Sequence, residues 1–238
     1  RGSLGSAQTT VADIKWTPSI QYSSDFTPPT SPSSSTNALV HFKGTDASII
    51  DKAQTANLEL VGNTTGSTTQ AKFTDTKSMY FDGTGDSIEV PSSNVFAYGT
   101  GNFTWECWIN VPGAVSNQYV LEHGANGGTL SVANNIIRYY NSTIGTSSNL
   151  YSGTTINYNT WHHVAVVRSS GTTTLYLDGT AEQSASDSHD YAAQNVYIGR
   201  YGGSPQYNFN GYIQDLRITK GLARYTANFT PPTQPLQG

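Results

Sequence analysis

The sequence predicts an all-β domain, built as a two-sheet antiparallel β-sandwich of the jelly-roll type. Three observations lead to this prediction: many short apolar runs separated by turn-forming residues, alternation of apolar and polar side chains within the runs, and almost no helical periodicity. The composition agrees, because only 12% of the 238 residues are charged, whereas 23 are Gly and 15 are Tyr. Two sheets packed face to face give this many short strands a single core.

The predicted strands follow one another along most of the chain. Each run is rich in β-branched and aromatic residues and is bounded by Gly, Asn, Asp or Ser. The runs are 38–42, 57–61, 78–82, 86–90, 102–110, 118–123, 135–140, 161–168, 172–177, 195–200 and 211–218. Residues Lys220 to Arg224 are predicted to form one helical turn.

The run NFTWECWIN at 102–110 illustrates how the strands are expected to lie. Successive side chains of a strand point to opposite faces of the sheet, so one set faces the core and the other is partly exposed. The core set is Phe103, Trp105, Cys107 and Ile109, and the other set is Thr104, Glu106, Trp108 and Asn110. Farther along, Asp178-Gly179 predicts a type I′ hairpin, because both central residues of that turn need positive φ.

A repeated phrase marks the organisation of the chain. Residues 22–32 read YSSDFTPPTSP, and residues 225–235 read YTANFTPPTQP. Two successive prolines make a stiff, extended exit from a domain, and the Tyr and Phe before them are expected to hold that exit against the sandwich. The repetition predicts one unit of a larger, tandem-repeat chain.

Three segments are expected on this basis. Residues 1–6 (RGSLGS) have the character of a cloning remnant. Residues 7–36 form an N-terminal extension that ends in a Pro- and Ser-rich linker, and they are the candidate end of an upstream repeat. Residues 37–238 form the β-sandwich domain.

Composition and motifs argue against several functions. The net charge of −4, with scattered Lys and Arg, gives no basic surface for nucleic acid, so we expect no nucleic-acid partner. No apolar run approaches the roughly 18 residues that a membrane span needs, so no membrane insertion is expected. The sequence also lacks the common hydrolase, metalloprotease and phosphate-binding motifs, and we expect no enzyme activity.

Five stretches carry a resemblance to a known family. In order, they are MYFDGTGDSIEVPSS (79–93), FTWECWIN (103–110), WHHVAVVR followed by LYLDG, VYIGR, and GYIQDLRITKGLARY (211–225). Together they resemble the concanavalin A-like lectin/glucanase superfamily, and within it the laminin G-like and pentraxin-like branch. Members of that superfamily that cleave β-glucans carry E-x-D-x-x-E on one strand. That triplet is absent here, so the resemblance implies a non-catalytic lectin-like module.

The closing phrase carries a second, narrower resemblance. ARYTANFTPPTQPL resembles the ends of such domains in phage and marine viral structural proteins, where copies stand in tandem. This resemblance implies a place on a virion, at the extracellular surface of a viral particle, for example in a tail fibre.

The same family resemblance implies a structural calcium ion. Many laminin G-like and pentraxin-like domains hold calcium, and Asp82 and Asp86 flank Gly83-Thr84-Gly85, while the resemblance would bring Asp215 close to that turn. The alternative is that Asp82 belongs to a simple turn and that Asp215 is an exposed carboxylate of a strand. Both interpretations stay open at this point.

Two stretches offer side chains for binding a sugar. Such sites combine an aromatic ring, which covers the C–H side of a pyranose, with amides and charged groups that bond the hydroxyls. The candidate ligand-binding residues are Arg138, Tyr139, Tyr140, Asn141, Arg200, Tyr201, Gln206, Tyr207 and Asn208.

The expected function is a non-catalytic, lectin-like adhesion module of a virion or tail protein, which contacts host cell-surface glycans. The alternative is an assembly or spacer domain that contacts neighbouring viral structural proteins and has no glycan ligand, and a glycoside hydrolase is a distant third. Convergence of Tyr139, Tyr201 and Tyr207 on one groove would favour the first, and scattered positions would favour the second.

Overall fold

A computed structural model describes most of the chain after the linker. The described residues are 36–42, 49–51, 58–74, 76–114, 116–124, 127–145, 147–203 and 206–236, and for 36–42 and 49–51 the backbone alone is described. Residues 34–238 belong to one compact unit. The predicted N-terminal extension, with its copy of the repeated phrase, lies outside the described residues.

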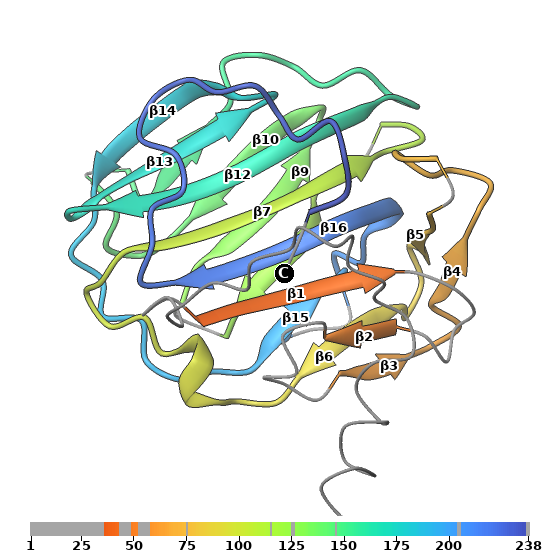
Figure 1. Cartoon of the computed structure of the whole chain (residues 1–238), viewed down its shortest axis with the longest axis horizontal. Coiled ribbons are helices and arrows are strands. Elements are labelled where there is room, and N and C mark those ends of the chain that lie inside the picture. Colours follow the sequence, from red (N-terminus) through yellow and green to blue (C-terminus); the bar gives the residue numbers. More distant parts are fainter. Residues whose placement is uncertain are drawn as a thin grey trace, which may run out of the picture. The chain divides into compact units, whose positions relative to one another are not determined.

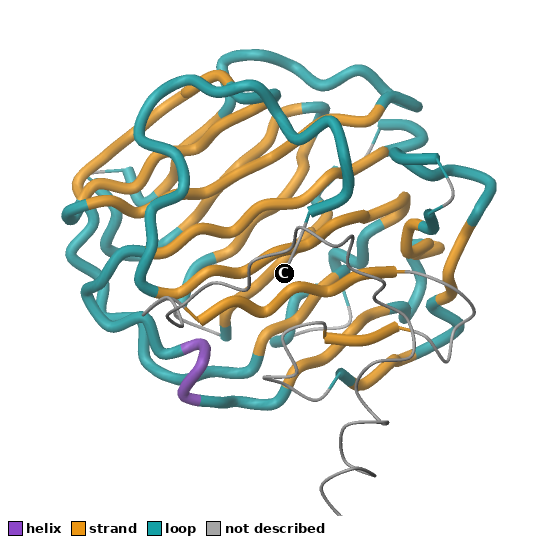
Figure 2. Tube along the Cα trace, in the orientation of Figure 1, coloured by secondary structure: helices purple, strands orange, loops and turns teal. Residues whose placement is uncertain are grey.

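The unit is a sandwich of two antiparallel sheets (Figure 1). Strands and loops make up nearly all of the described chain, and its one helix is a short 3-10 turn, η2, at Asn94–Phe96 (Figure 2). The predicted all-β, jelly-roll fold is therefore confirmed. No helix in the described part of the chain has the length and hydropathy of a membrane span.

Sheet A, which faces the viewer in Figure 1, has the strand order β14-β13-β12-β7-β16-β1-β2. Strand β5 also pairs with β16, and β4 pairs with β5. The bounds are β1 (Thr36–Phe42), β2 (Ile49–Asp51), β4 (Thr65–Ser67), β5 (Ser78–Asp82), β7 (Phe103–Asn110), β12 (Trp161–Ser169), β13 (Thr172–Leu177), β14 (Thr180–Ser186) and β16 (Asn210–Lys220).

Sheet B lies behind sheet A, in the order β11-β10-β9-β8-β15-β6-β3. Its strands are β3 (Glu59–Val61), β6 (Ser87–Val90), β8 (Gln118–His123), β9 (Thr129–Ala133), β10 (Ile136–Tyr140), β11 (Asn149–Tyr151) and β15 (Val196–Ile198). The sequence runs predicted most of the strands, and the hairpin at Asp178-Gly179 implied β14, but β2, β4, β9 and β11, which have three to five residues each, were missed. Such short strands carry too little alternation to be recognised.

Alternation along β7 builds the core as expected. Trp105 and Cys107 are buried between the sheets, and Phe103 and Trp105 pack with Tyr98 in an aromatic cluster. The hairpin between β13 and β14 turns at Asp178 (φ 48°) and Gly179 (φ 79°), as predicted for a type I′ turn.

The second face of β7 was predicted to be partly exposed, and this was wrong. All eight residues of the strand are buried. Two segments cover this face: Lys72 and Phe73 lie against Trp108, and residues 221–236 contact Thr104 and Glu106. Residues 221–236 appear as the dark blue tube over β12 to β14 in Figure 1. The short apolar face of Ala165, Val167 and Tyr176 is thereby covered by Ala223, Tyr225 and Phe229.

The helical turn predicted at Lys220–Arg224 is also wrong. Strand β16 continues to Lys220, and the residues after it contain no helix. Their backbone N–H groups bond to neighbouring segments instead: Gly221 N donates to Asn102 O at 2.8 Å, and Arg224 N donates to Thr104 Oγ1 at 3.0 Å.

Candidate ligand-binding site

The outer face of sheet B, turned away from the core, collects polar and aromatic side chains in two rows. The strand register sets these rows, because residues paired across neighbouring strands lie about 4.8 Å apart and share a face. The first row is Tyr140, Thr129, Glu122, Tyr197 and Glu89, and the second is Tyr151, Arg138, Ser131 and Tyr119.

The connection from β15 to β16 places two more tyrosines at the edge of this face. Tyr201 lies 5.2 Å and Tyr207 lies 5.6 Å from Tyr119, measured between ring centroids, and Tyr201 and Tyr207 are 6.3 Å apart. Backbone bonds hold the connection there, since Tyr119 N donates to Tyr207 O at 3.0 Å and Gly199 N donates to Val120 O at 3.1 Å. The three rings form one cluster, which we call the tyrosine cluster.

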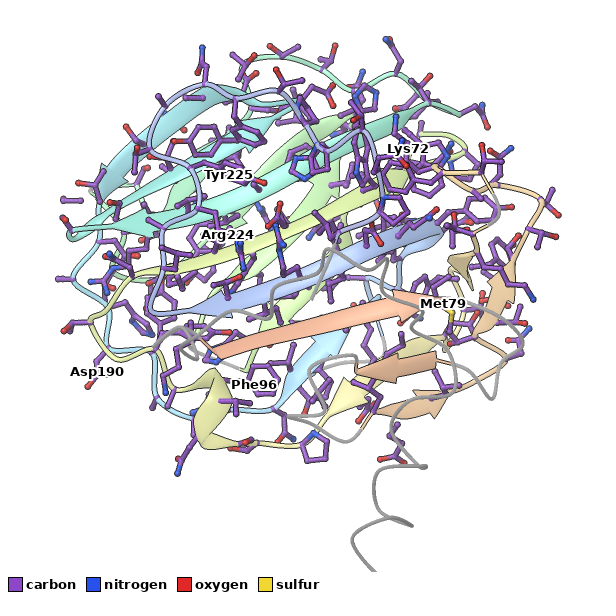
Figure 3. All side chains as sticks on the ribbon, in the orientation of Figure 1. Lys72, Met79, Phe96, Asp190, Arg224 and Tyr225 are labelled. Atoms are coloured by element: carbon purple, nitrogen blue, oxygen red, sulfur yellow. The ribbon has the colours of Figure 1, made fainter. Side chains whose placement is uncertain are left out.

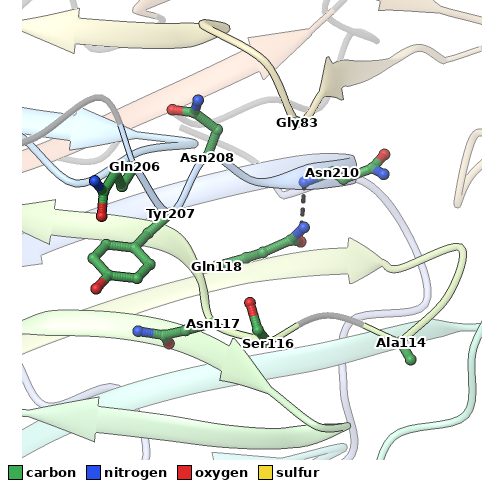
Figure 4. Close-up of a pocket in the computed structure, with 9 residues that line it drawn as sticks. All are labelled: Gly83, Ala114, Ser116, Asn117, Gln118, Gln206, Tyr207, Asn208 and Asn210. Carbon is green, nitrogen blue, oxygen red and sulfur yellow. Dashed lines mark hydrogen bonds between the residues drawn. The ribbon is translucent and has the colours of Figure 1, made fainter.

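A polar pocket of about 550 Å³ opens beside the tyrosine cluster (Figure 4). Three loops make it: the β5–β6 turn, the β7–β8 connection and the β15–β16 connection. It is lined by Gly83, Ala114, Ser116, Asn117, Gln118, Gln206, Tyr207, Asn208 and Asn210. Tyr207 belongs to both features, so the pocket and the cluster are continuous. Five amide side chains make the lining unusually rich in hydrogen-bond donors and acceptors.

Tyr207 has a backbone conformation that a tyrosine rarely adopts. Its φ is +68°, in the left-handed region, and its side chain remains 42% exposed. Positive φ is costly for residues other than Gly, Asn and Asp, and such strain gathers at functional sites. This backbone conformation directs the Tyr207 ring toward Tyr119 and Tyr201 and leaves the ring partly exposed.

Glu122 is the carboxylate at the centre of the face. Burial raises the pKa of Glu122 to about 7, although the N–H of Gly202, which donates to Oε2, and the charge of Arg200 both oppose the rise. The side chain is almost fully buried under the β15–β16 connection. Near neutral pH, Glu122 can therefore either donate or accept a hydrogen bond.

Three polar atoms on the outer face of sheet B have no hydrogen-bond partner among the described residues. They are Thr129 Oγ1, Ser131 Oγ and Arg138 Nε, all buried. Buried polar groups are nearly always paired, with protein, water or ligand. The face thus keeps hydroxyl and guanidinium groups available for a polar partner.

Arg200 lies on the outer face of sheet B, where it contacts two members of the first row. Its Nη2 lies 2.7 Å from Glu89 Oε1, and its guanidinium lies 5.0 Å from the centroid of the Tyr197 ring. These contacts anchor the start of the connection that carries Tyr201. Arg200 is therefore placed to position the loop.

The structure brings together most of the predicted ligand residues, but not all. Arg138 and Tyr140 lie on the outer face of sheet B, while Tyr201, Gln206, Tyr207 and Asn208 lie in the connection beside it. Of the three tyrosines expected to converge, Tyr201 and Tyr207 do so.

Tyr139 and Asn141 are not at this surface, which corrects the prediction for these two residues. Tyr139 has the opposite parity to Arg138 and Tyr140 on β10, so it points into the core, where its hydroxyl lies 2.7 Å from that of Tyr191. Asn141 is fully buried and donates from Nδ2 to Tyr191 Oη at 2.8 Å.

Sequence reasoning missed Tyr119, Glu122, Asn117 and Gln118. Asn117 precedes the run QYVLEH, which holds the other three and contains a β-bulge between Tyr119 and Leu121. The bulge shifts the alternation and places Tyr119 and Glu122 on the same face. No local sequence pattern predicts such a bulge. Tyr119 is recognised only when the register with β9 is known.

The predicted calcium ligands do not come together. Asp86 is buried and accepts hydrogen bonds from Asn63 N at 2.8 Å and from Asp82 N at 3.0 Å. Asp215 lies far along β16, well beyond the residue that pairs with Asp82, and its Oδ2 accepts from Leu236 N at 2.8 Å. Within the described residues, no group of three or more His, Cys, Asp or Glu side chains has metal-binding geometry. These carboxylates bond backbone amides and do not fit a calcium site.

Comparison with known proteins gives a family and a set of similar folds. Residues 82–223 match the family described as the concanavalin A-like lectin/glucanases superfamily. No curated protein sequence matches the chain.

Among solved structures, the binding domain of botulinum neurotoxin serotype D/C VPI 5993 is similar, with a TM-score of 0.60 and 13% identity over 79% of this chain and 49% of that one. The binding domain of botulinum neurotoxin DC in complex with rat synaptotagmin II is similar with a TM-score of 0.58 and 14% identity, over 77% of this chain and 48% of that one. The chain thus spans about half the length of these neurotoxin structures. A third similar structure is domain 4 of AbnA, a GH43 extracellular arabinanase from Geobacillus stearothermophilus, in complex with arabinotriose. Its TM-score is 0.59 and its identity 17%, over 78% of this chain and 92% of that one.

Proposed function

Since the chain belongs to the concanavalin A-like lectin/glucanase superfamily, we propose that it is a non-catalytic glycan-binding module whose ligand lies on the outer face of sheet B. The observation that carries the proposal is the convergence of Tyr119, Tyr201 and Tyr207 beside a pocket lined with amides. Aromatic faces suit the C–H side of a sugar ring, and amides suit its hydroxyls.

The chemistry of the face favours a neutral, hydroxyl-rich ligand over a charged one. The pocket lining contains no charged side chain, and the net charge of the chain is −4. Arg138 is the cation nearest to the tyrosine cluster in the second row of the face, and its unpartnered Nε is a single donor suited to a hydroxyl or a ring oxygen. An oligosaccharide supplies such groups at every residue.

Binding without cleavage is the better interpretation of Glu122. A raised pKa is a property of a general acid, but glycoside hydrolysis needs a second carboxylate across the scissile bond. Glu89 lies two strands from Glu122 and forms an ion pair with Arg200, and Glu59, the other carboxylate of this row, lies three strands away. Since neighbouring strands are about 4.8 Å apart, the distant alternative, a glycoside hydrolase, lacks a nearby free partner for Glu122 among the described residues of this row.

We place this module on the surface of a virion, where it would contact host glycans. The support is the resemblance of the closing phrase to the ends of domains in phage and marine viral structural proteins. The alternative, an assembly domain that contacts neighbouring viral proteins, has support of its own, because the similar neurotoxin fold was solved with a protein, synaptotagmin II.

A glycan array probed with the full chain, with and without calcium, tests the proposal. We expect binding to at least one neutral oligosaccharide, unchanged by calcium, and no release of shorter saccharides during prolonged incubation. Absence of binding to every glycan at high micromolar protein would contradict the proposal and favour the assembly role. Release of shorter saccharides would instead support the hydrolase.

A further inference from the structure

The last residues of the described chain form a closing segment, Tyr225 to Pro235, on the outer face of sheet A. The rings of Tyr225 and Phe229 are stacked with centroids 3.5 Å apart and planes within 6° of parallel. Phe229 also lies 5.5 Å from the Tyr176 ring and 5.7 Å from the His163 ring. The stacked pair is thus inserted among side chains of β12 and β13. Figure 3 shows Tyr225 over these strands.

Three hydrogen bonds fix the register of the closing segment. Tyr225 Oη donates to Glu106 Oε2 at 2.6 Å, and Phe229 N donates to Gly179 O at 2.8 Å. Ala181 N donates to Asn228 Oδ1 at 2.9 Å. The anchors are therefore a Tyr, a Phe and an oxygen acceptor three residues after the Tyr.

The segment seals a buried ion pair. Glu106 is fully buried, and its Oε1 lies 2.8 Å from Nε and 2.7 Å from Nη2 of Arg217. His163, also fully buried, lies 3.4 Å from the other carboxylate oxygen. A buried charge depends on full hydrogen bonding, so the Tyr225 hydroxyl completes the site.

The N-terminal copy of the phrase carries every one of these anchors. Aligned on the shared residues, Tyr22 corresponds to Tyr225, Phe26 to Phe229, and Asp25 to Asn228, so that a carboxylate replaces the amide as acceptor. The two eleven-residue phrases differ only in conservative exchanges at four places, which as changes in the C-terminal copy are T226S, A227S, N228D and Q234S. None of the four removes a contact described above.

We propose that residues 22–32 are a second closing segment, which binds the outer face of sheet A of another unit of this fold. Tyr22 and Phe26 would occupy the places that Tyr225 and Phe229 take here.

 Phe26 would stack on Tyr22, and it would lie against the residues of the other unit that correspond to Tyr176 and His163. In the present unit the same face is already covered by residues 225–235, so the partner would be an upstream unit whose own closing segment is residues 22–32. This interaction is independent of any ligand on sheet B, and it would link units into an array.

A graft within the full chain tests whether the N-terminal phrase can close this face. The four substitutions T226S, A227S, N228D and Q234S convert residues 225–235 into the sequence of residues 22–32. We expect the graft to melt within about 2 °C of the parent, whereas Phe229→Ala should lower the melting temperature by about 5 °C or more. A graft that melts as early as Phe229→Ala would overturn the proposal.

A binding experiment tests the contact between units. The probe is a fluorescent peptide of residues 22–32, and the receptor is the full chain with Tyr225→Ala and Phe229→Ala, checked for native circular dichroism. We expect the peptide to bind this variant at least tenfold more tightly than it binds the parent, in which the face is covered. A peptide with Phe26→Ala is the control and should not bind.

Equal binding to the parent and the variant, or no binding to either, would contradict a contact at this face. If the double variant does not fold, the graft decides the question, because it keeps every anchor of the closing segment.

Discussion

The hydroxyl of Tyr225 donates a 2.6 Å hydrogen bond to the carboxylate of Glu106, although the two residues are 119 positions apart in the chain. The bond joins the closing segment to the centre of β7 and completes the shell of a buried charge. The closing segment, which is one copy of the repeated phrase, therefore packs on the outer face of sheet A. The other face carries the tyrosine cluster and the polar pocket, so the two faces have separate tasks.

Loss of the partner of Glu106 should destabilise the fold strongly. Arg217→Leu removes the closest cation of the buried Glu106 and leaves Arg224, whose Nε lies 3.9 Å from Oε1, as the remaining arginine, so we expect the free energy of unfolding to fall by about 3–5 kcal/mol. The matched control is Arg200→Leu, which removes the partly exposed ion pair with Glu89 and should cost about 0–1 kcal/mol. Urea denaturation measures both. Equal losses in the two variants would contradict the importance of the buried pair.

The same carboxylate should make the fold sensitive to acid. Burial alone would raise the pKa of Glu106, but its hydrogen bond with His163 and the charge of Arg217 outweigh burial and lower the pKa to about 2. A lowered pKa stabilises the native state above the ordinary value of 4.5, and this stability is lost as the pH falls toward 2. We expect unfolding free energies, measured between pH 6 and pH 2, to fall more steeply in the parent than in Glu106→Gln. Parallel curves would argue against this ionisation.

Gly179 should be indispensable because the closing segment passes directly over it. A Cβ at Gly179 would collide with the backbone oxygen of Phe229, whereas a Cβ at Gly85 would meet nothing within 4 Å. Both glycines have φ of +79°, so Gly179→Ala and Gly85→Ala share the backbone strain and differ in the collision. We expect Gly179→Ala to expose the bond after Arg224 to trypsin, and Gly85→Ala to leave it protected. Equal cleavage of the two variants would contradict the packing of the segment.

The ionisation of Glu122 should change the stability of the fold with pH in the direction opposite to that of Glu106. Its pKa is raised by burial from 4.5 to about 7, so the native state binds the proton more tightly than the unfolded chain does. Native stability is therefore lost as the pH rises from about 4.5 to about 7, and Glu122→Gln cannot undergo this loss. We expect Glu122→Gln to be more stable than the parent at pH 8, with a smaller difference at pH 5. Thermal melts at the two pH values measure this, and a constant difference would contradict the raised pKa.

The tyrosine cluster should dominate glycan affinity. Tyr201→Ala removes one of three converging rings, and we expect the dissociation constant for any glycan found on the array to rise by about tenfold or more, which corresponds to about 1.4 kcal/mol. The matched control is Tyr212→Ala, which removes one ring of a tyrosine pair on sheet A, with centroids 5.1 Å apart. Titration calorimetry compares them. A weaker effect of Tyr201→Ala than of Tyr212→Ala would place the ligand elsewhere.

The sequence alone determined the local part of this protein. Alternation in 102–110 assigned Trp105 and Cys107 to the core, and Asp178-Gly179 assigned a hairpin, because both properties depend on neighbours in the chain. The same local rule, applied to IIRYY, places Tyr139 opposite to Arg138, so its burial could have been expected. The order of the motifs was sufficient to indicate the family.

Only the tertiary structure decided which distant residues meet. Tyr119 joins Tyr201 and Tyr207 because a bulge in β8 and the β15–β16 connection bring them together, and neither has a local pattern. Likewise, Glu106 on the second face of β7 is buried by a segment more than a hundred residues away, so its exposure could not follow from alternation. Alternation distinguishes the two faces of a strand, but long-range packing determines what covers each face.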